Sequence, residues 1–280
     1  MVFKVIVIVI IGAGFCWNLF SQSSDSTLVL DQLVREMLQQ NSDLQASYNQ
    51  WQVISARAPQ AGSLPDPILG IGVMDLPVNS FAFDQEMMTG KQISFMQMFP
   101  FPGKQGTRKA IVSSEAAAAE QNYVQKQIEL IKILKITYFE LFYVDKAVAT
   151  NKHNGELLNQ ISRIAESRYR TGKGLQQDVL KAQLELSKLM DNLLDLQQQR
   201  QSQVAQVNFL LNRDRSDALA KTEELKFIPF EKDLVELQTQ AEKNNPLLLS
   251  WQMMNQQNNQ KVKLAKREYL PDFSVELAYT

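Results

Sequence analysis

The spacing of apolar residues near the start of the chain predicts a helix followed by two strands. Over residues 28–58 apolar side chains recur three and four positions apart, which is typical of an amphipathic helix. Pro59 and Gly62 predict the end of that helix. At about 67–75 and again at 91–99, apolar residues alternate with small or polar ones, which is the period of a half-buried strand. The pattern therefore predicts a helix that leads into a pair of β-strands.

The next segment, residues 105–212, has the pattern of a long antiparallel helical hairpin. Its first arm is rich in helix formers up to Gly172-Lys173-Gly174, where two glycines predict the turn. At 1.5 Å per residue, an arm of some 65 residues would extend roughly 100 Å. The second arm has apolar residues alternately four and three positions apart, which is the seam of a coiled coil: Leu175, Val179, Ala182, Leu186, Leu189, Leu193 and Leu196.

After a mixed, polar stretch, the opening pattern of the chain returns. A second helix is predicted at 233–268 and a further strand at 272–280. Between them Leu270-Pro271-Asp272 repeats Leu64-Pro65-Asp66 from the entry to the first strand, and such self-similarity marks a duplicated structural unit. The predicted organisation is a first repeat over 24–232, which ends in the mixed segment 213–232, and the start of a second repeat over 233–280.

Residues 1–23 have the pattern of a signal peptide. Lys4 precedes the apolar run 5–17, which is shorter than the roughly 20 residues that a helix needs to span a bilayer. Cys16 raises the alternative of a lipid anchor, but Phe15 precedes it where lipoprotein processing requires a small residue. We therefore expect an exported protein.

Composition excludes several classes of site. The chain has 280 residues with 29 basic and 30 acidic side chains, so no global charge favours nucleic acid. Its one Cys and one His exclude a disulfide framework, a Cys-based zinc site and a multi-His metal centre. We find no catalytic set and no phosphate-binding glycine loop, and we expect neither an enzyme nor a cofactor. Met87, Met88, Met96 and Met98 allow a copper(I) interpretation, but adaptable apolar packing is favoured.

The alternating strands suit a surface between lipid and water. One side of each strand is apolar and the other is small or polar, as at Ser274 and Glu276. Because lipid forbids open sheet edges, two strands per repeat need several chains to close a barrel; the alternative is an ordinary soluble sheet. The hairpin far exceeds the roughly 30 Å of bilayer hydrocarbon, so it must project into an aqueous space. The residues that we expect to face lipid are Leu69, Ile71, Val73, Ile93, Phe95, Phe99, Phe273, Val275, Leu277 and Tyr279.

Several short motifs, in their order along the chain, resemble the TolC-like outer-membrane efflux protein family. They are Asn41-Ser42-Asp43-Leu44, Leu64-Pro65-Asp66-Pro67, Gln97-Met98-Phe99-Pro100-Phe101-Pro102-Gly103-Lys104, Arg168-Tyr169, Gly172-x-Gly174-Leu175 and Asp178-Val179-Leu180-x-Ala182-Gln183. The resemblance implies a mainly α fold with membrane β-strands, in which long coiled-coil hairpins form an α-barrel and the strands form a trimeric transmembrane β-barrel. It also implies a homotrimer in the outer membrane of a Gram-negative bacterium, with a periplasmic extension.

The same resemblance implies a function and partners. The chain would be a channel subunit in a tripartite efflux or type I secretion system, a passive exit duct for drugs, metal ions or other substrates. A periplasmic adaptor protein would join it to an inner-membrane pump of the RND or ABC type. The segment 99–104 is most similar to the heavy-metal efflux branch. A family member needs both repeats, so we expect this sequence to be a fragment rather than a truncated product. The alternative is a periplasmic coiled-coil adaptor or scaffold without a pore, which explains the hairpin but not the strands.

The resemblance also places the adaptor contact at the hairpin tip, for which a plain helix–helix turn is the alternative. The tip residues are Thr171, Gly172, Lys173, Gly174 and Leu175. Three neighbouring charges would hold the tip closed or dock the partner, or would simply be solvated: Arg168, Arg170 and Asp178.

Overall fold

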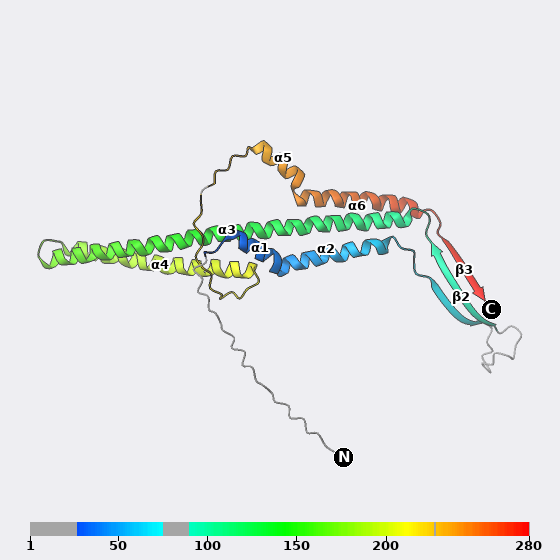
Figure 1. The fold of residues 1–280 in the computed structure, drawn as a ribbon, viewed down its shortest axis with the longest axis horizontal. Coiled ribbons are helices and arrows are strands. Elements are labelled where there is room, and N and C mark those ends of the chain that lie inside the picture. Colours follow the sequence, from blue (N-terminus) through cyan, green and yellow to red (C-terminus); the bar gives the residue numbers. More distant parts are fainter. Residues whose placement is uncertain (1–26, 75–89, 227, 280) are drawn as a thin grey trace, which may run out of the picture.

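The chain forms an elongated molecule with a small sheet at one end and a helical turn at the other (Figure 1). The structure is a computed structural model, and it describes residues 27–74, 90–226 and 228–279. The signal peptide predicted at 1–23, with Cys16, and the methionines Met87 and Met88 lie outside the described residues. The elements are α1 Leu30–Gln40, α2 Ser42–Ala61, β1 Ile68–Met74, β2 Gly90–Phe99, α3 Lys104–Arg170, α4 Gln176–Leu210, α5 Leu234–Asn244, α6 Pro246–Glu268 and β3 Phe273–Tyr279.

The helix predicted over 28–58 is two helices, α1 and α2, and they meet at Asn41. The backbone of Asn41 is extended, with ψ 121°, and its side-chain Oδ1 accepts a hydrogen bond from the Leu44 amide at 3.0 Å. A side chain that caps the following turn in this way begins a new helix, although the apolar spacing runs on across the break. Pro59 does not end α2, because it lies in the last turn and the helix continues to Ala61.

The helix predicted over 233–268 divides in the same way. Asn245 separates α5 from α6, and its Oδ1 accepts a hydrogen bond from the Leu247 amide at 2.9 Å. Pro246 occupies the first position of α6, where its missing N–H costs nothing. Both breaks thus fall on an asparagine, and each pair of helices leads through Leu-Pro-Asp into a strand of 7 residues.

Helix α3, which is 67 residues long, is the central helix, against which α1, α2, α4 and α6 pack. Helix α4 returns antiparallel to it, and α2 continues the line of α4 along the same side of α3 (Figure 1). The two helices join where Asn41 Nδ2 donates a hydrogen bond to the Leu210 carbonyl at 2.9 Å. On the opposite side α6 packs along the half of α3 nearer the sheet.

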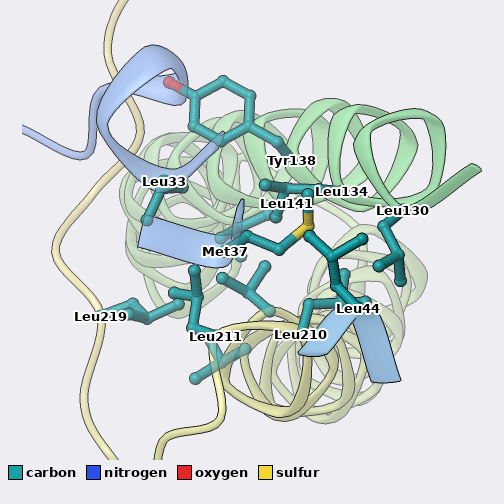
Figure 2. Packing of buried hydrophobic residues seen from close by; sticks show 12 residues of the cluster. Leu33, Met37, Leu44, Leu130, Leu134, Tyr138, Leu141, Leu210, Leu211 and Leu219 are labelled. Atoms are coloured by element: carbon teal, nitrogen blue, oxygen red, sulfur yellow. The ribbon is translucent and has the colours of Figure 1, made fainter. Parts of the chain in front are cut away.

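The hydrophobic core lies where α1, α3 and the end of α4 meet. Figure 2 shows Met37 of α1 between Leu134 and Leu141 of α3 and Leu211 just after α4, and these side chains are fully buried. Full burial of one such side chain is worth about 1.5–3 kcal/mol. This cluster anchors α1 on the hairpin and fixes the long helices relative to each other.

The segment that follows α4 is held against this core by a β-bridge and hydrogen bonds. Leu28 pairs with Thr222 in an isolated parallel bridge. Tyr138 donates a hydrogen bond from its hydroxyl to the Leu28 carbonyl at 2.7 Å, and that hydroxyl accepts one from the Glu223 amide at 3.3 Å. Burial raises the pKa of Tyr138. Arg200 of α4, four residues after the last leucine of the predicted seam, forms an interhelical ion pair with Asp145 of α3 at 2.7 Å.

Candidate functional site

The three strands form an antiparallel sheet in the order β1-β2-β3, and its register puts the predicted lipid-facing residues on one face. Cross-strand partners share a face, and alternate residues of a strand do so as well. One row joins Leu69, Phe95 and Leu277 across the three strands. The next row joins Ile71, Ile93 and Tyr279, and Phe99 pairs with Phe273 at the end nearer the helices.

This apolar face is open to solvent in the single chain. Its ten predicted residues are between 40% and 81% exposed, with Ile71 the most exposed. Val73 pairs with Lys91 and Val275 pairs with Gln97, so polar residues enter the face only at two places. A monomeric soluble protein rarely exposes so large a contiguous apolar surface, which indicates that lipid or another protein covers it.

The opposite face of the sheet is mostly small or polar, although Ile68, Met74, Met96 and Met98 also lie on it. Gly70, Ser94 and Ala278 form its central row, and Met96 lies opposite Glu276. Met96 and Met98 are both on this side of β2, since they alternate with Phe95 and Phe99. In the described ranges no group of His, Cys, Asp and Glu side chains could hold a metal ion. The sheet therefore separates an apolar surface from one that suits water.

Strands β1 and β3 each have one edge without a strand partner in the described part of the chain. Exposed edges of this kind pair readily with further strands. As for the helices of the described ranges, none has the combination of length and apolar character that crossing a membrane requires.

The turn between α3 and α4 lies at the end of the molecule farthest from the sheet (Figure 1). Gly172 has φ +70°, a conformation that favours glycine, and its amide donates a hydrogen bond to the Tyr169 carbonyl at 3.0 Å. The Lys173 amide donates to the Arg168 carbonyl at 2.8 Å. This pair of bonds is the Schellman arrangement, which satisfies the last carbonyls of a helix.

The tip presents its side chains to solvent. Thr171, Lys173 and Leu175 are exposed, and Leu175 is 65% exposed. The three charges predicted to form a network are exposed as well, and no ion pair joins them to each other or to any other residue that the structure describes. Their role in closing the tip or docking a partner stays a prediction. His153, also exposed, lies on α3 away from these residues.

A polar junction joins the sheet to the helices, and the sequence did not reveal it. Lys104, 3% exposed at the start of α3, donates from Nζ to Asp272 Oδ1 and to the Leu270 carbonyl, each at 2.7 Å. Asp272 also accepts a hydrogen bond from the Phe101 amide at 2.8 Å. The hydrogen bond from Lys104, followed by that from Phe101, lowers the pKa of Asp272.

Arg267 completes the junction from the last turn of α6. Its Nη1 donates to the Gly103 carbonyl at 2.6 Å and to the Thr107 hydroxyl. The end of α6 and the start of β3 are thereby tied to the start of α3, about 160 residues earlier in the chain. Both halves of the junction belong to motifs quoted above, Pro-Gly-Lys and Leu-Pro-Asp, but nothing in the sequence pairs one with the other.

The sequence and the fold are similar to those of known proteins. The family described as outer membrane efflux protein matches residues 33–213. Among curated proteins, none matches the chain significantly. The outer-membrane channel OprN has a similar fold, with a TM-score of 0.73 and 17% identity over 89% of this chain and 59% of OprN.

Two further solved structures have the same fold. The outer membrane protein VceC of Vibrio cholerae has a TM-score of 0.68 and 20% identity, over 89% of this chain and 61% of VceC. The Campylobacter jejuni CmeC outer membrane channel has a TM-score of 0.69 and 18% identity, over 88% of this chain and 55% of CmeC. The chain spans about three fifths of the length of these structures. The predicted fold class, mainly helical with a long antiparallel hairpin and a few strands, is confirmed.

Proposed function

Since the chain belongs to the outer membrane efflux protein family, we propose that it is a subunit of an outer-membrane channel. Its task is passive: it supplies part of a duct through which a tripartite efflux or type I secretion system releases its substrate, and it catalyses no reaction. The observation that carries this proposal is the sheet with one apolar face and one mostly small or polar face, placed at the end of a helix of 67 residues.

We infer that the sheet lies in the membrane and that the hairpin tip lies in the periplasm. The apolar face of the sheet contacts lipid, and the face with Gly70, Ser94 and Ala278 lines the water-filled lumen. Further strands pair with the free edges of β1 and β3, because lipid does not tolerate open edges. Barrel closure therefore requires several copies, and a homotrimer is the number that the resemblance to the family implies. Helix α3, at roughly 100 Å, is too long to lie in the bilayer, so it projects into the periplasm.

The hairpin tip is then the end that meets the rest of the secretion machinery. Thr171 to Leu175 are the candidates for contact with a periplasmic adaptor protein, which joins the duct to an inner-membrane pump. The exposed charges of Arg168, Arg170 and Asp178 lie in the adjoining turns of α3 and α4 and are free for pairing with that partner.

Single-channel conductance of the full-length protein in planar bilayers tests the proposal. We expect discrete current steps from the trimeric fraction and none from the monomer. Leu277→Lys places a charge on the lipid side at a cost of about 2–4 kcal/mol, so it should reduce insertion. The matched variant Ala278→Lys puts the same charge on the lumen side, so it should insert normally and alter ion selectivity. Absence of current from the trimer would contradict the proposal and would favour a scaffold without a pore.

A further inference from the structure

A hollow of about 370 Å³ lies between α2, α3 and α6, in the half of the helical body nearer the sheet. Its floor is made by Ala118 and Ala119 of α3, and its walls come from the two flanking helices. Volumes of this size are typical of small-molecule sites in proteins. Neither the sheet face nor the hairpin tip includes any residue of this hollow.

The hollow exists because the first quarter of α3 has small side chains. Ala118 is buried, and each alanine offers only a methyl group where a leucine would reach between α2 and α6. Two hydrogen bonds hold α6 in place beside this stretch. Ser250 Oγ donates to Asn122 Oδ1 at 2.9 Å, and Gln257 Nε2 donates to Glu115 Oε2 at 3.0 Å. The space between the helices is therefore held open by polar contacts at both of its ends.

Trp51 of α2 supplies a fixed aromatic wall. Its indole stacks on Tyr123 with ring centroids 6.0 Å apart and an angle of 17° between the planes. Tyr48 packs edge-on against Trp51 at 5.6 Å. Ring pairs of this geometry add about 0.5–1.5 kcal/mol to simple burial, so the indole has little freedom to turn away from the hollow.

Two opposite charges line the same space. Glu115 of α3 uses one carboxylate oxygen for Gln257, and Lys261 lies one helical turn beyond Gln257 on α6. No ion pair in the described ranges includes either Glu115 or Lys261. An acid and a base that face one hollow without pairing with each other can each receive a group of opposite charge from a ligand.

We propose that this hollow binds a planar aromatic zwitterion, a molecule with one ring system, one ammonium group and one carboxylate. The ammonium group pairs with Glu115, the carboxylate pairs with Lys261, and the ring packs against Trp51. The methyl floor of Ala118 leaves room for a molecule about the size of an aromatic amino acid. This inference does not depend on channel activity, because it concerns only the packed helices.

Isothermal titration calorimetry on the full-length protein in detergent tests the proposal with three related ligands. L-Tryptophan carries both charges, tryptamine carries only the ammonium group, and indole-3-propionate carries only the carboxylate. We expect L-tryptophan to bind at least about tenfold more tightly than either analogue, because a charge-assisted hydrogen bond is worth about 1.4 kcal/mol or more. Equal affinity for the three ligands, or no heat from any of them, would overturn the proposal.

Substitutions at the two charged residues then test which group of the ligand each residue binds. Glu115→Gln still accepts the hydrogen bond from Gln257, and it should abolish the preference for L-tryptophan over indole-3-propionate. Lys261→Met should abolish the preference over tryptamine. Ala118→Leu should weaken all three ligands about tenfold or more by filling the hollow. Glu120→Gln and Lys263→Met, exposed and outside the hollow, are the matched controls. If Glu115→Gln leaves the preference intact, the assignment is wrong.

Discussion

Replacement of Asn41 by alanine tests how the hairpin is joined to the helix that leads into the sheet. Asn41 is 5% exposed and uses both ends of its side-chain amide. Its Oδ1 caps α2 at the Leu44 amide, and its Nδ2 binds the Leu210 carbonyl at the end of α4, at 3.0 Å and 2.9 Å. Asn245 offers a matched control, since it caps α6 in the same way through the Leu247 amide at 2.9 Å.

The two substitutions should differ by the contact that Asn41 makes to α4. Loss of an N-cap costs about 1 kcal/mol, which is the expected effect of Asn245→Ala. Asn41→Ala loses a cap as well and also leaves the Leu210 carbonyl without its buried donor, at about 1–2 kcal/mol more. We therefore expect a total of roughly 2–3 kcal/mol for Asn41→Ala, or two to three times the effect of the control.

Chemical unfolding in detergent, followed by circular dichroism at the helical band, measures this difference directly. With equal slopes, the free energy of unfolding should fall about 1–2 kcal/mol further for Asn41→Ala than for Asn245→Ala. Equal losses for the two variants would refute the reasoning, because they would mean that the bond to Leu210 contributes nothing to the junction of α2 with α4.

Two further predictions concern the hairpin tip and the junction with the sheet. Gly172→Ala should lower the free energy of unfolding by about 1 kcal/mol, because alanine is strained at the positive φ of residue 172. Gly155→Ala, inside α3, should raise the free energy of unfolding by up to about 1 kcal/mol. Thermal unfolding of the two variants checks that the two effects have opposite signs. The lowered pKa of Asp272 means that its ionised form stabilises the junction above the ordinary carboxyl pKa of about 3.9, and that this contribution is lost as the pH falls through the lowered pKa. Hydrogen-exchange protection of the Phe101 amide should follow this loss, and Lys104→Met should reduce both the protection and its pH dependence; unchanged protection in Lys104→Met would contradict the role of the ion pair.

The regular patterns of the chain were predictable because each depends on neighbouring residues. The four-and-three spacing after Leu175 predicts α4, the glycine pair at 172 and 174 predicts the turn, and the alternation at Ile93 and Phe95 predicts which side of β2 is apolar. Each of these signals lies within a few positions of the feature that it specifies.

The breaks and the long-range contacts were not predictable in this way. The apolar spacing continues through Asn41 and Asn245, so the caps became visible only in their side-chain hydrogen bonds. The same asparagines occupy equivalent positions of the two repeats, and this equivalence is the feature of the sequence that could have indicated the two helix breaks. The pairing of Lys104 with Asp272 joins residues far apart in the chain, and a single sequence contains no information on such a pair.

The central claim is that one face of the β1–β3 sheet contacts lipid and the other contacts water. Spin labels at single cysteines, in a cysteine-free variant of the full-length protein reconstituted in liposomes, test it directly. Labels at Phe95 and Leu277 should collide with oxygen dissolved in the bilayer, whereas labels at Ser94 and Ala278 should collide with a water-soluble nickel complex. Such an alternation along both strands is the predicted result. Equal access of the nickel complex to all four positions would contradict the account, because it would place both faces of the sheet in water.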